Sequence, residues 1–134
     1  MNKVINIGLT VIIVLAAMSC DFARSEGDWD DNIHLSTKSV DLPAEATSTM
    51  ITTGETGWWV ESYGWNGDWS SAVGEDTIEE NFIIEAEEFT IERRNGTEIH
   101  ITLTENPTSD ERVLVISLQN GNYFDGVTIT QAGN

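Results

Sequence analysis

The chain has few of the residues that cross-link a fold or carry out catalysis. It contains one cysteine and two histidines among 134 residues, so an intrachain disulfide is excluded. No GxSxG, HExxH or phosphate-binding glycine loop is present. Carboxylate pairs are frequent, but with 23 acidic residues such pairs arise by chance, and a glycosidase needs two carboxylates at a set separation. We therefore expect a protein that is not an enzyme, with a small hydrolase as a distant third reading of its function.

Cofactor and metal sites are not expected either. Asp28, Asp30 and Asn32 have the spacing of the first ligands of an EF-hand loop. The sixth position of such a loop should be glycine, and here it is Ile33. The sequence thus predicts neither a bound metal nor a cofactor.

Basic residues are scarce as well. Six Lys and Arg residues stand against 23 Asp and Glu residues, for a formal net charge of −17. Nucleic-acid binding depends on Lys and Arg neutralising phosphates, so no nucleic-acid partner is expected. The acidity favours solubility and weak self-association.

Only one long apolar run is present, Val4 to Met18. It is too short for a membrane-spanning helix, which needs about 20 residues, and it has the length and flanks of a signal peptide. The small residues before Cys20 resemble the lipobox of bacterial lipoproteins. That resemblance implies cleavage before Cys20 and acylation of its thiol, which with two or more chains anchors a protein stably. The alternative is an ordinary secretory signal with an incidental cysteine.

Three segments follow from this reading: a signal peptide over 1–19, an acidic tether over 20–34 and one domain over 35–134. The tether is polar and has no hydrophobic period. Its acidic residues soon after Cys20 resemble the surface-export signal of Bacteroidetes lipoproteins. We therefore expect the protein at the outer membrane or cell surface, attached to the membrane through its lipid.

The domain has the period-two pattern of β-strands interrupted by turn residues. Asn95-Gly96 suits a tight hairpin turn. Residues 75–89 fit a helix or a strand, and we favour the strand. The expected core includes Ile99, Ile101, Leu103, Val115 and Ile129. The expected strands are Leu35 to Leu42, Thr47 to Thr53, Trp58 to Tyr63, Phe82 to Ala86, Phe89 to Arg93, Thr97 to Thr104, Val113 to Leu118 and Val127 to Gln131.

Several short motifs resemble the BACON domain, the Bacteroidetes-associated carbohydrate-binding often N-terminal domain. They are Phe89-x-Ile91, Glu105-Asn106, Arg112 opening the next strand, the closing Ile129-Thr130-Gln131 and, earlier, Gly57-Trp58-x-Val60. The resemblance covers about residues 36 to 134. It implies an all-β, immunoglobulin-like antiparallel β-sandwich, structural roles for Asn106, Arg112 and Gln131, and carbohydrate binding.

The stretch WWVESYGWNGDW, residues 58–69, contains four of the five tryptophans. If it is extended, its side chains alternate between two faces, and Trp58 and Val60 share one of them. The resemblance to the BACON domain implies that this pair belongs to the core. The opposite face would form a platform for apolar sugar faces, with carboxylates accepting hydroxyl hydrogen bonds. The candidate glycan-binding residues are Trp59, Glu61, Tyr63, Trp65, Asp68 and Trp69. The alternative is that loop 64–80 covers these rings and makes a second small core.

Two functions of different classes remain open. The first is a surface-anchored lipoprotein whose non-catalytic module binds a polysaccharide or host glycan. The second is a structural or interaction module that docks beside neighbouring surface proteins and binds no glycan. Asp76-Thr77-Ile78 also resembles the short sequon for O-glycosylation in Bacteroidetes, which predicts modification of Thr77.

Overall fold

The computed structural model describes residues 30–72 and 76–134. The predicted signal peptide, Cys20 and the first part of the tether lie outside the described residues. The described chain forms nine strands and no helix: β1 (Ser39–Leu42), β2 (Thr47–Thr52), β3 (Trp59–Trp65), β4 (Asp68–Ser71), β5 (Phe82–Glu85), β6 (Phe89–Arg94), β7 (Glu98–Leu103), β8 (Arg112–Asn120) and β9 (Tyr123–Gln131). No helix in this part of the chain is long and apolar enough to cross a membrane.

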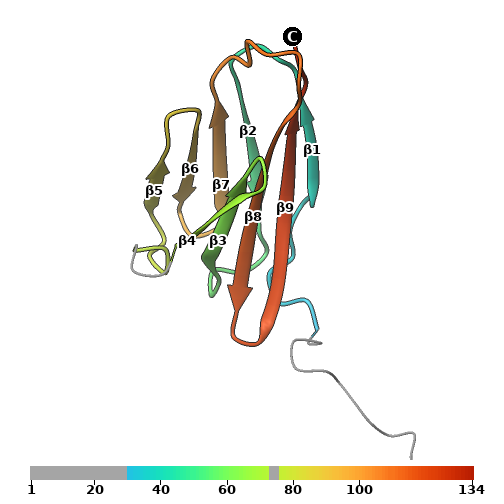
Figure 1. The fold of residues 1–134 in the computed structure, drawn as a ribbon. Helices are drawn as coiled ribbons and strands as arrows, with labels where there is room; N and C mark the ends of the chain where they lie inside the picture. Colours follow the sequence, from blue (N-terminus) through green and yellow to red (C-terminus); the bar gives the residue numbers. More distant parts are fainter. Residues whose placement is uncertain (1–29, 73–75) are drawn as a thin grey trace, which may run out of the picture.

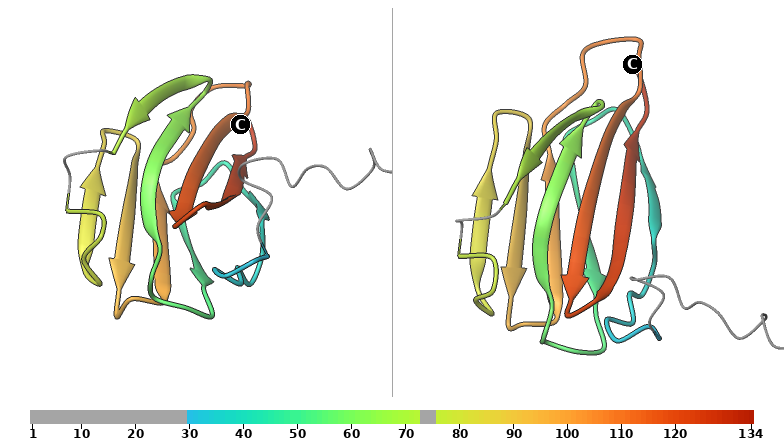
Figure 2. Two further views of the ribbon diagram at one scale, coloured as in Figure 1. Left: turned by 90° about the horizontal axis from the view of Figure 1, so that it is seen from below. Right: turned by 60° about the horizontal axis from the view of Figure 1, so that its bottom comes forward.

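The strands form two sheets that pack face to face (Figure 1). One sheet has the order β1-β9-β8-β3-β4, and the other has the order β2-β7-β6-β5. This arrangement confirms the all-β sandwich. One pair departs from the antiparallel prediction, because β1 runs parallel to β9. β4 was not predicted at all, and it lies beside β3 at the free edge of the five-stranded sheet (Figure 2).

Three hairpins are closed by short turns that contain a residue of positive φ: two residues separate β3 from β4 and β8 from β9, and three separate β6 from β7. Asn95-Gly96 joins β6 to β7, as predicted, with φ of 53° and 73°. Asn66-Gly67 joins β3 to β4 in the same way, with φ of 50° and 88°. Gly121, with φ of 60°, opens the turn between β8 and β9. Asparagine and glycine adopt such angles at little cost, which is why these dipeptides set hairpin positions.

The core lies between the two sheets and is mostly aliphatic. Ile99, Ile101, Leu103 and Ile129 are buried, as predicted. Val115 is not in this core, because it pairs with Gly64 on the opposite side of β8 from the buried Leu114 and Ile116. The central position predicted for this strand is correct, since β8 lies between β9 and β3.

A buried arginine joins the sheets near the start of β3. Arg93 is 1% exposed, and its guanidinium carbon lies 3.7 Å from the centre of the Trp58 ring. Its Nη1 donates to the carbonyls of Trp58 and Glu79, and its Nη2 donates to those of Thr56 and Gly96. These hydrogen bonds satisfy the charged donors away from water. The clamp holds the segment before β3 against the β6–β7 turn.

The expected structural roles of Asn106 and Gln131 are observed. Asn106 is fully buried, and its amide donates to the carbonyls of Asp110 and Ala132. Gln131 donates to the carbonyls of Ala44 and Thr104. These contacts tie the loops at one end of the sandwich to its last strand.

Two further contacts bear on the domain boundaries and the loop after β7. Arg112 donates from its Nη1 to the carbonyl of Glu105 at 3.2 Å, which agrees with the structural role expected of it.

Ile33, assigned to the tether by sequence, is fully buried, and its backbone N–H donates a hydrogen bond to the Asp31 carboxylate. Every core residue of the described chain therefore lies between Ile33 and Gln131, so a chain that begins at Asp21 contains the whole core.

Candidate functional site

A β-bulge at Glu61 determines which side chains of β3 point into the sandwich and which point outward. Val60 pairs with Leu118 on β8, whereas Ser62 pairs with Ser117, so Glu61 is an extra residue on β3. Such a residue disrupts the ladder and changes which side chains point inward. Up to Val60 the alternation is as predicted, and Trp58 and Val60 are confirmed as core. Beyond Glu61 the alternation is reversed.

Because of this reversal, Tyr63 and Trp65 point into the sandwich. They pair with Ile116 and Leu114, which are fully buried. Their ring centroids lie 5.9 Å and 5.0 Å from that of Phe89 on the opposite sheet. The prediction that Tyr63 and Trp65 share a face with Trp59 is therefore wrong. The alternative is not observed either, since Phe89 of β6, not loop 64–80, covers these two rings.

The opposite side of the five-stranded sheet faces away from the other sheet, and we call it the outer face. In-register partners on neighbouring strands point to the same side, so the pairing defines its members. They are Ser39, Asp41, Trp59, Ser62, Gly64, Trp69, Ser71, Val113, Val115, Ser117, Gln119, Phe124, Gly126, Thr128 and Thr130.

Three aromatic side chains stand on the outer face. Trp59, Gln119 and Phe124 form one row across β3, β8 and β9. Phe124 is 51% exposed and Trp69, on β4, is 58% exposed. Trp59 is half-buried. Large apolar side chains exposed on one face of a small domain can mark a binding surface. Phe124 was missed by sequence because β9 was begun at Val127, although the Gly121-Asn122 turn indicates a longer hairpin.

The Trp69 ring lies across Gly64. A Cβ at Gly64 would stand 2.9 Å from Cε2 of Trp69, closer than real side chains approach. Glycine thus allows the indole to lie flat on the sheet. Between this ring and the Trp59 row is a strip of small residues, in which Ser62 pairs with Ser117 and Ser117 with Gly126. The Trp59, Phe124 and Trp69 rings therefore flank a strip of the sheet that carries only small side chains.

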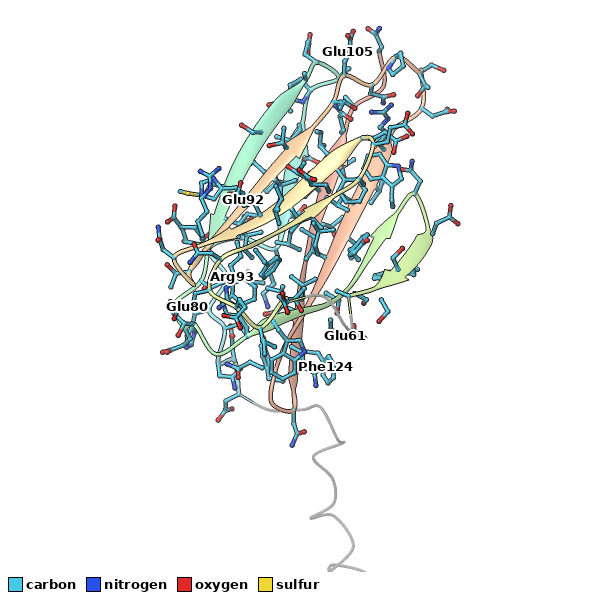
Figure 3. The ribbon with its side chains drawn as sticks, turned by 90° about the vertical axis from the view of Figure 1, so that its left-hand side faces the viewer. Glu61, Glu80, Glu92, Arg93, Glu105 and Phe124 are labelled. Carbon is cyan, nitrogen blue, oxygen red and sulfur yellow. The ribbon has the colours of Figure 1, made fainter. Side chains whose placement is uncertain are left out.

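The two carboxylates of the predicted site lie apart. Glu61 accepts a hydrogen bond of 2.6 Å from the Ser62 hydroxyl, which places its carboxylate beside the outer face. Asp68 is exposed and pairs with Trp65 at the β3–β4 turn. Glu61 and Phe124 lie toward the same end of the domain, and Glu105 lies at the other end (Figure 3). Of the six predicted residues, the outer face thus unites Trp59, Trp69 and the Glu61 carboxylate.

Thr77 is placed where its hydroxyl is not accessible. It is 3% exposed, and its Oγ1 donates to the carbonyl of Val60 at 3.0 Å. A glycan on Thr77 would require this hydrogen bond to break, or attachment before the chain folds. Modification of Thr77 stays a prediction with that constraint.

A polar network lies on the inward side of β9, next to Phe124. Asp125 accepts hydrogen bonds from the Tyr123 hydroxyl at 2.6 Å and the Gly126 N–H at 2.8 Å, and its other partner is Lys38 at 2.9 Å. Burial by itself raises the pKa of Asp125, but these donors outweigh it and hold that pKa below its usual value. Burial and the Asp125 carboxylate raise the pKa of Tyr123, which stays a protonated donor.

A depression of about 400 Å³ lies near this network, at the β8–β9 turn. It is lined by Asp30, Asn32, Asn120, Gly121, Asn122 and Tyr123. Asn32 and Asn120 donate their amide N–H groups to each other's backbone carbonyls. These amides fasten the N-terminal segment to the hairpin, which leaves them less available to a ligand than the open outer face. Within the described residues, no group of three or more His, Cys, Asp or Glu side chains is arranged to hold a metal ion.

Comparison with solved structures supports the fold. An NMR structure of a protein from Bacteroides thetaiotaomicron superimposes with a TM-score of 0.58 at 16% identity, covering 72% of this chain and 77% of that one. A C. elegans MSP family member, WR4, is matched with a TM-score of 0.32 at 12% identity over 76% of this chain and 97% of that one. At these identities the first likeness concerns the fold alone, and the second is too weak to add to it.

Comparison with sequences identifies one family. No curated protein matches the chain. A family model does match, over residues 79–132, and that segment contains β5 to β9. Phe124, Gln119 and Ser117 of the outer face lie within the matched segment, whereas Trp59 and Trp69 lie outside it. Within this segment the match agrees with the resemblance inferred from the motifs: residues 79–132 match the BACON family, described as "Putative binding domain, N-terminal".

Proposed function

We propose that this protein is a surface-anchored lipoprotein whose sandwich binds a glycan on the outer face of the five-stranded sheet. The observation that carries the proposal is the set of three aromatic side chains, Trp59, Trp69 and Phe124, on one outward sheet face above a floor of small residues. Sugar rings present apolar C–H faces that pack on aromatic rings. Trp and Phe bury large areas in such contacts.

Polar groups beside the rings suit the sugar hydroxyls. Ser62, Ser117 and Gln119 stand between the aromatic residues on the same face. Hydroxyl and amide side chains both donate and accept hydrogen bonds, as a sugar hydroxyl does. The combination of apolar rings with a few placed polar groups is the usual composition of a ligand site.

The membrane attachment is part of the same proposal. Cleavage before Cys20 and acylation of its thiol would place the sandwich at the end of a short acidic segment at the cell surface. In the Cys20→Ser variant we expect no incorporation of labelled palmitate and release of the protein into the soluble fraction. Membrane association that survives the substitution would contradict this anchor.

The glycan-binding surface is tested by removing single rings. Trp69→Ala and Phe124→Ala, each in a chain beginning at Asp21, should weaken retardation in polysaccharide-containing gels by about tenfold, equivalent to the loss of about 1.4 kcal/mol. Both side chains are more than half exposed, so the melting temperature should hardly change.

The matched control is Ile83→Ala, which removes a side chain of 50% exposure from the other sheet. It should leave retardation unchanged. Equal loss of binding in the control, or retention in both ring variants, would exclude the outer face as the site. Absence of any glycan binding in the unmodified protein would favour the interaction module that binds neighbouring surface proteins.

A further inference from the structure

The charge of the outer face restricts the class of glycan. None of the fifteen outer-face residues in the described strands is Lys or Arg. Arg112, on β8, pairs with the buried Gln131 on the inward side and reaches over the Trp65 ring at 5.8 Å. The charged groups that do border the face are carboxylates, those of Asp41 and Glu61.

An acidic polysaccharide would meet no pairing partner there. Carboxylate and sulfate groups are bound in proteins mainly by Arg and Lys, which form charge-assisted hydrogen bonds with them. Without such partners, a uronic acid or sulfate would be desolvated near Glu61, with Asp41 further away on the same face, in a chain of formal net charge −17. Like-charge contacts of this kind oppose binding and select against the wrong partner.

The spacing of the rings restricts the length of the ligand. The row of Trp59 and Phe124 crosses β8 at Gln119, and the row that contains Gly64, beneath Trp69, crosses β8 at Val115. Four residues along a strand correspond to about 14 Å. One sugar ring cannot contact aromatic side chains at both ends of such a strip, whereas several linked sugars can.

We propose that the outer face binds an extended, uncharged polysaccharide that lies along the strands from the Trp59 and Phe124 row to Trp69, and that it discriminates against acidic polysaccharides. This inference rests on the proposed glycan-binding function. A second copy of this chain is the competing occupant of the face, and the acidity of the chain opposes it.

The test uses pairs of polysaccharides that share a backbone and differ in charge. The chain from Asp21 is run in gels containing hydroxyethyl cellulose or carboxymethyl cellulose, and amylopectin or amylopectin sulfate, at low ionic strength. For each backbone that retards the protein, we expect the neutral form to bind at least about tenfold more tightly, because like charges oppose the acidic form.

The outcomes separate the two proposals. Retardation by no member of any pair contradicts the proposed function, and this inference with it. Equal or stronger retardation by an acidic member leaves the function standing and overturns the charge selectivity. A dimer in solution that Trp69→Ala dissociates would assign the face to a second copy and overturn the inference.

Two further measurements test the geometry. In the double variant Asp41→Asn, Glu61→Gln, retardation by the acidic member should increase while that by the neutral member stays the same. An unchanged acidic-to-neutral ratio would show that these carboxylates do not set the selectivity. Among neutral oligosaccharides, affinity should rise with length until the strip between the two rows is spanned; a monosaccharide that binds as tightly as its oligomers would contradict the extended mode.

Discussion

The two sides of β3 carry similar aromatic side chains in opposite surroundings. Tyr63 and Trp65 face the other sheet and contact Phe89. Trp59 faces outward, in the same row as the exposed Phe124, and Trp69 extends this outward surface from the next strand. Residue type alone does not separate the two groups, since each contains tryptophan.

The difference between the two sides comes from one inserted residue. With a regular β3, Trp59, Tyr63 and Trp65 would all face one way. The bulge at Glu61 sends the last two inward, where they fill the space above Phe89. The inner rings are therefore expected to contribute mainly to stability, and the outer rings mainly to binding.

The largest effect is expected on the inner side at Trp58. Trp58→Ala should lower the free energy of unfolding by about 3–5 kcal/mol, because it leaves a large cavity. It also removes the ring that covers the buried Arg93 guanidinium. Urea unfolding followed by circular dichroism measures the loss. A change below that of Trp69→Ala would contradict the assignment of Trp58 to the core.

Trp65 tests the reversal caused by the bulge. Trp65→Ala should destabilise the protein by about 2–3 kcal/mol, since it removes the contact with Phe89 at 5.0 Å. Glycan binding by the folded variant should persist, because the ring does not reach the outer face. Loss of binding in Trp65→Ala at an unchanged melting temperature would contradict this assignment, because it would place the Trp65 ring on the outer face.

Asp125 and Phe124 are neighbours on β9 that face opposite sides of the sheet, so we expect Asp125 to contribute to stability and Phe124 to binding. The pKa of Asp125 is lower in the folded state than its usual value. The ionised carboxylate therefore stabilises the fold at pH values above the usual aspartate pKa of about 3.9. This contribution is lost as the pH falls through the lower folded-state pKa. Asp125→Asn should cost about 1–2 kcal/mol at neutral pH.

The pH profile provides the check on Asp125. The difference between the unmodified protein and Asp125→Asn should shrink below about pH 4, because Asp125 of the unmodified protein then becomes protonated and is uncharged, as Asn is. Asp41→Asn, on the outer face, is the matched control and should alter stability little. A difference that stays constant down to about pH 2 would show that ionised Asp125 is not the stabilising form.

The smallest stability change is expected at Gly64. Gly64→Ala should change stability by less than about 0.5 kcal/mol, because the exposed Trp69 ring can move away from the new methyl group. The displaced ring should alter the near-ultraviolet circular dichroism and weaken glycan binding. In a Trp69→Ala background the same substitution should have no further effect on binding; an undiminished effect there would mean that Gly64 acts through something other than this ring.

Much of the fold was predictable because the signals are local. Period-two alternation, and for β8 a continuous apolar run, located the interior of eight strands, and Asn95-Gly96 located one hairpin. Asn66-Gly67 is an equally strong hairpin signal and would have revealed β4 had residues 64–80 not been treated as a loop. Val115 was misplaced because a central strand with apolar residues on both sides gives no local indication of which side faces the other sheet.

The candidate site was predictable only in part. Trp59, Trp69 and the Glu61 carboxylate, all named from the sequence, lie together at the outer face, whereas Tyr63 and Trp65, named with them, face inward. Phe124 comes from a strand more than fifty residues further along the chain. Its position beside Trp59 depends on the β3–β8–β9 pairing, which no local pattern specifies.

By itself, the amino-acid sequence determined the strand periodicity, the Asn-Gly turn and the acidity, because each of these depends on the residues present and their local preferences. Only the tertiary structure decided which way Tyr63 and Trp65 point, that Arg93 is buried against Trp58, and that Phe124 joins Trp59 and Trp69 on one face. The physical reason is that a bulge and a strand register are set by pairing between distant segments, and a shift of one residue exchanges the two faces of a strand.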